Sequence, residues 1–334
     1  MESVIKKLFY LVLVSLLTNY VSGKADRIPG GKSFAAGEFP YFVQIVTILL
    51  DDNGNIEAGS CGGSLIHPQW VLTAAHCFKT DRMIPPENFK NGSVRAYMGT
   101  ESIILLHLND TTLTFQFIQE AYIHDDYAYE HLDDSEDIIN DVAVALLKKP
   151  FVLNKYINII RLPDSNAKVC PLGVVIGQMI DYHGVTGKTL NYAHMHSKTE
   201  EELSEAPHFP RATSFYTETE FYKGSLIEPD AGGPFVCFDE LGPIQHGILS
   251  STYNTTTTSI DEYEMATAHL WFIKKYVPMN LHHTKLRSRN IQKHHSRDPQ
   301  TTSIAIWRKS SHIIWCITVI LYREYVLLYK SDLE

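Results

Sequence analysis

The chain has 334 residues, 44% of them hydrophobic and 20% charged, which is ordinary for a globular protein. This length suits one large all-β domain or two small ones. The formal net charge of −9 argues against nucleic acid as a general partner.

The first 23 residues have the pattern of a secretory signal peptide. Lys6 and Lys7 form a basic start, an apolar run from Leu8 to Leu17 follows, and Val21 to Gly23 supplies small residues for cleavage. The alternative is a membrane anchor, but this run is shorter than the roughly 20 residues that cross a bilayer. We therefore expect a secreted, extracellular protein with its signal in residues 1–23.

Three glycosylation triplets agree with export, and they begin at Asn91, Asn109 and Asn254. Each triplet alone is a weak signal, because such triplets arise by chance. The five cysteines are then expected in an oxidising compartment, where pairs form disulfides.

Several short phrases follow in chain order. Arg27 precedes Ile28 to Gly31, and alternating apolar residues from Phe39 to Ile45 indicate the entry into a strand. The phrases C-G-G-S-L-I, Cys61 to Ile66, and W-V-L-T-A-A-H-C, Trp70 to Cys77, come next.

A polar, acid-rich region occupies residues 107–137 and includes Tyr122 to Tyr127, with the text Y-I-H-D-D-Y. Its acids suggest a calcium site, but they lack the fixed ligand spacing of a calcium loop. We expect a solvated acidic loop instead. These acids are Asp125, Asp126, Glu130, Asp133, Asp134, Glu136 and Asp137.

Beyond this region, Asn140 to Leu147 runs into a continuous apolar stretch that is typical of a buried strand. The pair His194 and His196 invites a zinc interpretation. No third and fourth ligand stand at a recognisable spacing, so we expect a loop there and no metal site.

The stretch Gly224 to Pro234 contains the text P-D-A-G-G-P in residues 229–234. It is followed by Pro243 to Ser251, an apolar strand-like segment, and by Glu262 to Tyr276, which we interpret as a closing helix.

Together these phrases resemble the trypsin-like serine proteases of the S1 family, over residues 28–280. The usual family texts are R-I-V-G-G, C-G-G-S-L-I, W-V-L-T-A-A-H-C, N-D-I-A-L-L and G-D-S-G-G-P. The resemblance implies an all-β fold of two six-stranded antiparallel β-barrels with a C-terminal helix, and it implies no cofactor.

The same resemblance assigns roles to the site residues. His76 matches the catalytic imidazole, and Asp141 matches the carboxylate that orients it. The position of the nucleophilic serine holds Ala231. A methyl group has no lone pair and no proton to give up, so it cannot attack a carbonyl.

The oxyanion hole is altered as well. The family forms it from two backbone N–H groups, which here belong to Ala231 and Pro229. Proline has no N–H, and loss of one such donor costs on the order of 10² to 10³ in rate. The resemblance therefore implies two chemical lesions at neighbouring positions.

The resemblance also implies an activation site, in which cleavage between Arg27 and Ile28 removes a propeptide, residues 24–27. The freed amine of Ile28 would pair with Asp230. It further implies the disulfides Cys61–Cys77 and Cys170–Cys237. The implied specificity pocket contains Ser225, at the position where trypsins carry an aspartate, together with Ser250 and Thr252.

The tail, residues 281–334, has no counterpart in that family. Its first part, His282 to Arg297, is basic and resembles a linker. The later run Ile313 to Leu328 is short for a spanning helix. It either lies on a membrane surface, is disordered or is not part of the true protein. Cys316 is the odd cysteine, and the basic part of the tail is a candidate for contact with membranes or glycosaminoglycans.

Three classes of function follow, of which the third is a membrane-associated or glycan-binding protein that makes its contacts through the basic tail. The first is a secreted, inactive protease homologue that binds extracellular proteins, such as proteases or their substrates, as a cofactor or regulator of a protease cascade. The second is an active S1 endopeptidase with a non-standard nucleophile, for which Ser225 is the candidate because it lies in the same loop.

Overall fold

The computed structural model describes residues 31–50, 56–79, 83–108, 110–132, 135–179, 188–204, 211–220, 226–227, 230–255 and 257–278. The predicted signal, propeptide and tail lie outside these residues. The same is true of Arg27, Ile28, Asn109, Ser225, Pro229 and Cys316.

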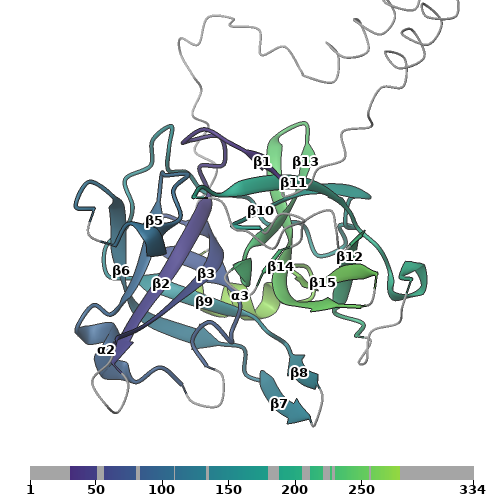
Figure 1. Cartoon of the computed structure of the whole chain (residues 1–334), viewed down its shortest axis with the longest axis horizontal. Helices are drawn as coiled ribbons and strands as arrows, with labels where there is room; N and C mark the ends of the chain where they lie inside the picture. Colours follow the sequence, from purple (N-terminus) through teal and green to yellow (C-terminus); the bar gives the residue numbers. More distant parts are fainter. Residues whose placement is uncertain are drawn as a thin grey trace, which may run out of the picture. The chain divides into compact units, whose positions relative to one another are not determined.

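Six antiparallel strands form a closed barrel in the order β2-β3-β4-β9-β6-β5 (Figure 1). They are β2 (Phe42–Leu50), β3 (Ile56–His67), β4 (Trp70–Thr73), β5 (Val94–Met98), β6 (Thr114–Ile123) and β9 (Ala143–Leu147). Apolar side chains such as Val43, Leu65, Val71 and Ile118 fill the interior. The apolar run predicted as a buried strand is β9, which pairs with β4 on one side and β6 on the other.

Seven strands form a second antiparallel sheet in the order β1-β11-β10-β13-β14-β15-β12. They are β1 (Lys32–Ser33), β10 (Leu172–Gly177), β11 (Asn191–His196), β12 (Ser214–Glu220), β13 (Pro234–Asp239), β14 (Gly242–Asn254) and β15 (Thr258–Met265). The all-β fold is confirmed, with one closed six-stranded barrel. The second unit differs from a closed six-stranded barrel, because β1 extends one edge and β12 pairs only with β15 at the other.

Two expected loops are strands in the structure. The acidic region forms a hairpin of β7 (Ala128–Leu132) and β8 (Ser135–Ile139) in place of a loop. His194 and His196 lie in β11, where they face Val174 and Leu172 of β10, so the expectation of a loop was wrong there. Both segments are rich in polar residues, so their local composition did not indicate that they pair as strands.

The remaining described elements are short. They are the helices α2 (Pro86–Lys90) and α3 (Leu270–Tyr276) and the 3-10 turns Ile104–Leu106 and Glu200–Glu202. The predicted closing helix is confirmed but begins later, because Glu262 to Met265 pairs with β14 and β12 as part of β15. None of the helices in the described ranges has the length and apolar character needed to cross a bilayer.

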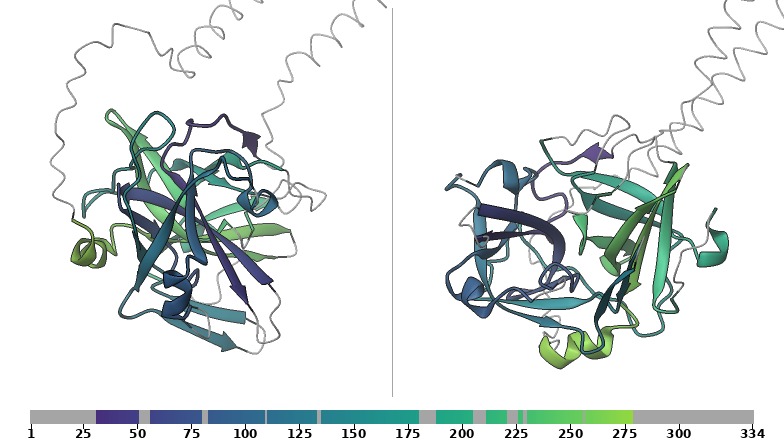
Figure 2. Two further views of the ribbon diagram at one scale, coloured as in Figure 1. Left: turned by 90° about the vertical axis from the view of Figure 1, so that its left-hand side faces the viewer. Right: turned by 60° about the horizontal axis from the view of Figure 1, so that its bottom comes forward.

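The barrel and the second sheet lie side by side, as the views in Figures 1 and 2 agree. One apolar cluster contains residues from both, including Leu72 and Val144 of the barrel, Val174 and Ile248 of the sheet, and Phe272 of α3. Burial of such side chains is the main stabilising contribution at this junction. Of the residues predicted to form the site, His76, Asp141, Ala231 and Ser250 lie close together here.

Candidate active site

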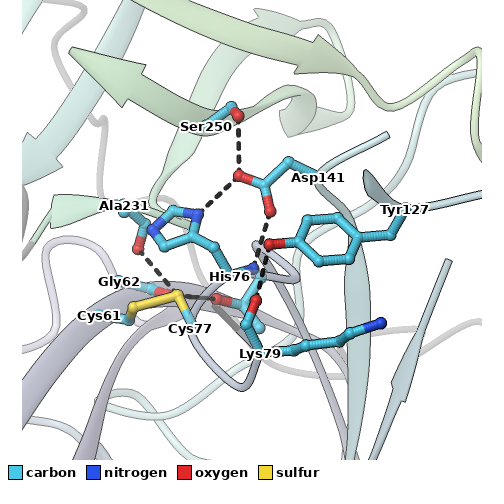
Figure 3. The surroundings of a disulfide bond; sticks show 10 residues. Cys61, Gly62, His76, Cys77, Lys79, Tyr127, Asp141, Ala231 and Ser250 are labelled. Atoms are coloured by element: carbon cyan, nitrogen blue, oxygen red, sulfur yellow. Dashed lines mark hydrogen bonds and ion pairs between the residues drawn. A yellow bond between two sulfur atoms is a disulfide. The ribbon is translucent and has the colours of Figure 1, made fainter. Parts of the chain in front are cut away.

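His76 and Asp141 form a hydrogen-bonded pair at the junction. His76 follows β4 and Asp141 precedes β9, so the paired strands bring the two residues together. The distance from His76 Nδ1 to Asp141 Oδ2 is 2.7 Å, and the backbone N–H of His76 donates to Asp141 Oδ1 at 2.9 Å. The second hydrogen bond holds the Asp141 carboxylate against the backbone of His76, the same residue whose ring it contacts (Figure 3).

Asp141 is fully buried, and its pKa reflects a competition. Burial alone raises the pKa of this carboxyl, but the neighbouring His76 and the hydrogen bonds from His76 and Ser250 outweigh burial and hold the pKa below its usual value. The carboxylate therefore stays ionised beside the imidazole. Such a carboxylate can fix the tautomer of a histidine that acts as a base.

Ser250 supplies the third bond to Asp141, with its hydroxyl donating to Oδ2 at 2.7 Å. The register between β14 and β15 shifts between Leu249 and Ser251, so Ser250 is the extra residue of a bulge. A bulge redirects a side chain out of the regular alternation. The structure thus places Ser250 against Asp141, whereas Thr252, the other described residue of the predicted pocket, contacts Asp261 of β15.

Ala231 is buried and is held through its backbone. Its carbonyl accepts the N–H of Gly62 at 2.7 Å, and the next N–H, that of Gly232, donates to Leu249 at 2.7 Å. Gly232 has a φ of +81°, and a Cβ there would lie 2.1 Å from Thr73 Oγ1. Only glycine fits this position. Figure 3 shows the imidazole of His76 between the Asp141 carboxylate and Ala231.

Both predicted disulfides are present in the structure, Cys61–Cys77 and Cys170–Cys237. The first lies beside the site, with Cys77 Sγ 3.8 Å from the carbonyl oxygen of Ala231. Within the described ranges, ligand atoms of Cys61, His76 and Cys77 lie within 4.8 Å of one another. Both sulfurs are committed to the disulfide, so this group offers no thiolate to a metal.

Asp230 is fully enclosed behind the site and accepts three backbone hydrogen bonds. Their donors are the N–H groups of Gln178, Met179 and Ile227. A Cβ on Gly177 would lie 2.4 Å from Asp230 Cγ, so the glycine admits this carboxyl. Burial raises the pKa of Asp230 to about 6 despite these donors. The partner expected from the sequence, Ile28, lies outside the described residues.

A buried pair behind Asp141 was missed by the sequence interpretation. The N–H of Asp141 donates to Glu264 Oε1 at 3.2 Å, and Glu264 Oε2 is 2.8 Å from His269 Nε2. Both side chains are buried, and the His269 ring meets that of His124 at 5.1 Å between centroids. Alternating acids in a strand normally indicate a solvent-facing side, so the sequence carried no signal for this pair.

Comparison with known proteins agrees with this geometry. A family model described as Trypsin matches residues 28–269. The chain is 32% identical over 154 residues to the venom peptide isomerase heavy chain of Agelenopsis aperta. This alignment covers 44% of this chain and 56% of the isomerase heavy chain. The chain is also 32% identical over 144 residues to a trypsin of Sus scrofa, covering 42% of this chain and 48% of the trypsin. The chain spans about half the length of the curated relatives it matches.

Proposed function

Since the chain belongs to the trypsin family, we propose that it is a secreted member that has lost peptide hydrolysis. In this proposal it binds an extracellular protein, such as a protease or a protease substrate, as a cofactor or regulator of a protease cascade. The observation that carries the proposal is Ala231, beside a hydrogen-bonded His76–Asp141 pair. The base is retained and the hydroxyl that it would deprotonate is missing.

Two further features support the loss of hydrolysis. Pro229 has no N–H to offer to an oxyanion, and Ser225 stands where trypsins carry the aspartate of their specificity pocket. Loss of the nucleophilic serine alone costs about a millionfold in turnover in subtilisin, a serine protease of unrelated fold with the same triad geometry. A protein with alanine at position 231 and proline at position 229 retains its binding surfaces but has no efficient acyl transfer.

Secretion is supported by the signal-like residues 1–23, the two disulfides and the predicted glycosylation sites. Asn91 and Asn254 are exposed, as a glycan acceptor has to be. In the proposal, cleavage after Arg27 supplies an amine to Asp230, whose buried carboxyl has no cationic partner within the described part of the chain.

The test is a turnover assay on the full chain, before and after cleavage at Arg27. We expect no hydrolysis of a fluorogenic peptide panel and no labelling by a fluorophosphonate probe. Hydrolysis that disappears in a His76→Ala variant would contradict the proposal. Probe labelling that disappears in a Ser225→Ala variant would instead support the endopeptidase alternative.

One relative is named a peptide isomerase, and the His76–Asp141 pair is a base without a nucleophile. The same incubations are therefore analysed for a change of chirality in the peptides. We expect none, because stabilising a carbanion-like oxyanion needs the donor that Pro229 lacks.

A further inference from the structure

One of the predicted glycosylation triplets, Asn91 to Ser93, lies in a well-held turn on the outside of the barrel. Asn91 ends α2, and its backbone N–H donates to the carbonyl of Glu87 at 2.8 Å. The N–H of Ser93 donates to the carbonyl of Asn88 at 2.9 Å, and its own carbonyl accepts the N–H of Ile48 at 2.9 Å. The triplet is therefore fixed by α2 on one side and by the barrel on the other.

The side-chain amide of Asn91 has an engaged oxygen and an available nitrogen. Its Oδ1 accepts the N–H of Ser93 at 3.0 Å and the hydroxyl of Ser93 at 2.6 Å, whereas Nδ2 donates to none of the described residues. The residue is exposed. Because Nδ2 is the atom to which an N-linked sugar is attached, the acceptor atom of the triplet faces no competition from the described protein.

The middle residue of the triplet lies directly on an aromatic ring. Gly92 has a φ of +81°, and a Cβ there would lie 2.7 Å from a ring carbon of Phe117. Glycine permits both the left-handed backbone and this close approach. The turn that carries Asn91 is thus held against Phe117 of β6.

The Phe117 ring belongs to none of the buried apolar clusters that the described residues form. It is partly exposed and meets the ring of Phe115 edge-on, at 5.3 Å between centroids. The guanidinium of Arg95 lies 5.7 Å from the Phe117 centroid, and Arg95 Nε donates to the carbonyl of Gly92 at 3.0 Å. The ring therefore offers apolar surface to a neighbour at the place where a sugar on Asn91 would emerge.

A sugar ring matches such a surface chemically. A pyranose carries C–H groups on its faces and hydroxyls around its edge, so one face can pack on an aromatic ring while the hydroxyls stay in water. The electron-rich face of the aromatic ring attracts the weakly positive hydrogens of those C–H groups. The contact also removes apolar surface of both rings from water.

We propose that Asn91 carries an N-linked glycan whose first N-acetylglucosamine packs on Phe117. In the transfer step, Nδ2 of Asn91 loses a proton and bonds to C1 of the sugar, and the diphosphate of a lipid-linked oligosaccharide donor leaves. The inference rests on the proposed secretion, because the chain meets that donor on the secretory route, and it is independent of the loss of hydrolysis. The glycan covers the barrel face formed by β5 and β6 (Figure 1), so a partner protein has to bind another face.

The first test is mass spectrometry of the full chain, expressed in a eukaryotic secretory host with oligomannose glycans and trimmed by an endoglycosidase to a single N-acetylglucosamine. We expect the peptide that contains Asn91 to carry the mass of this sugar in most molecules. Secreted chain without sugar at Asn91 overturns the inference and leaves the proposed secretion standing. Retention of the chain inside the cells contradicts the proposed secretion instead, and the Asn91 peptide of the retained chain still decides occupancy.

The second test is thermal unfolding of glycan-free variants with and without the ring. Ser93→Ala abolishes the triplet but keeps Asn91, and Phe117→Leu removes the ring. We expect Ser93→Ala to lower Tm by about 2 °C more in the presence of Phe117 than in the Phe117→Leu background. Thr256→Ala, which abolishes the triplet at Asn254, is the matched control and should have the same effect in both backgrounds.

NMR spectra of the trimmed, otherwise unaltered chain give a result even if Phe117→Leu does not fold. Hydrogens above the face of an aromatic ring resonate upfield of their usual positions. We expect upfield-shifted signals of the N-acetylglucosamine on Asn91, with nuclear Overhauser contacts to the Phe117 ring. An occupied Asn91 whose sugar signals stay at the positions of the free sugar, without these contacts, overturns the packing on Phe117.

Discussion

At the residue scale, the site places the hydrogen-bonded pair His76 and Asp141 beside Ala231. Asp141 receives bonds from the ring and backbone of His76 and from Ser250, so the imidazole is held as a base would be. Residue 231 is alanine, and the loop around it is fixed by backbone contacts to Gly62 and Leu249. The chemistry at this position is therefore separable from the shape of the loop.

We expect Ala231→Ser alone to leave peptide hydrolysis very low, because position 229 still has no N–H for the oxyanion. Adding Pro229→Gly to Ala231→Ser should raise kcat/KM on the order of 10² to 10³ relative to the single variant. Fluorogenic peptides and cleaved protein are used for both. Equal rates of the single and double variants would show that proline is not the second lesion.

Asp261 should make the free energy of unfolding depend on pH. Its pKa is raised from 3.8 to about 6 in the folded chain, so the folded state binds the proton more tightly than the unfolded state. This contribution is fully present below about pH 3.8 and is lost as pH rises through about 6, on the order of 3 kcal/mol.

Urea denaturation of Asp261→Asn checks this expectation. The variant should be more stable than the unaltered chain at pH 7.5, and the difference should shrink towards pH 4. Asp164→Asn serves as the exposed control. A difference that is the same at both pH values would contradict the raised pKa.

At the element scale, the strands that carry strong family phrases could be predicted from the sequence, and other strands could not. β9 could be predicted because its apolar run is local, and both disulfides could be predicted because the family resemblance implies them. The start of α3 and the strand character of His194 and His196 could not, because pairing with neighbouring strands decides them. Asp261, Glu264 and His269 acquire their roles only through contacts between residues far apart in the chain.

The Glu264–His269 pair should stabilise the junction between the barrel and the second sheet. Removing one member of a buried pair leaves the other uncompensated, so His269→Ala should lower the free energy of unfolding by roughly 3 kcal/mol or more. His269→Gln keeps a donor and should cost less. The exposed pair Lys275–Asp125 is the control, and Lys275→Ala should cost much less than His269→Ala because solvent screens an exposed ion pair.

Chemical denaturation measures these three variants under one condition. A second measurement is the NMR signal of the Nδ1 proton of His76, which reports on Asp141. It should shift in His269→Ala and stay unchanged in Lys275→Ala. Equal destabilisation by the two alanine variants would show that the buried pair has no special role.

At the scale of the whole molecule, the trypsin-family region and the tail differ in their relation to known proteins. The family match covers residues 28–269, and residues 281–334 have no counterpart in it. The basic run His282 to Arg297 suggests a contact with anionic polymers or lipids. A contact of this kind would depend on charge and should weaken as salt rises.

We expect the full chain to be retained on heparin at low salt more strongly than a chain that ends at residue 280. Binding to vesicles with anionic lipids should follow the same order. Column elution and vesicle co-sedimentation measure the two effects. Equal behaviour of both chains would remove the tail from the account of partners.

The anchoring of residue 231 by Gly62 and of Gly232 by Leu249 has a quantitative consequence. In the proposed function, the chain binds a partner protein without acyl transfer, so the partner stays bound until it dissociates and is not cleaved. Each molecule of this protein then binds one partner molecule at a time, so the size of its effect is proportional to its concentration. One molecule of an active enzyme, by contrast, cleaves many substrate molecules. Dose–response curves for this protein should accordingly saturate near one-to-one stoichiometry.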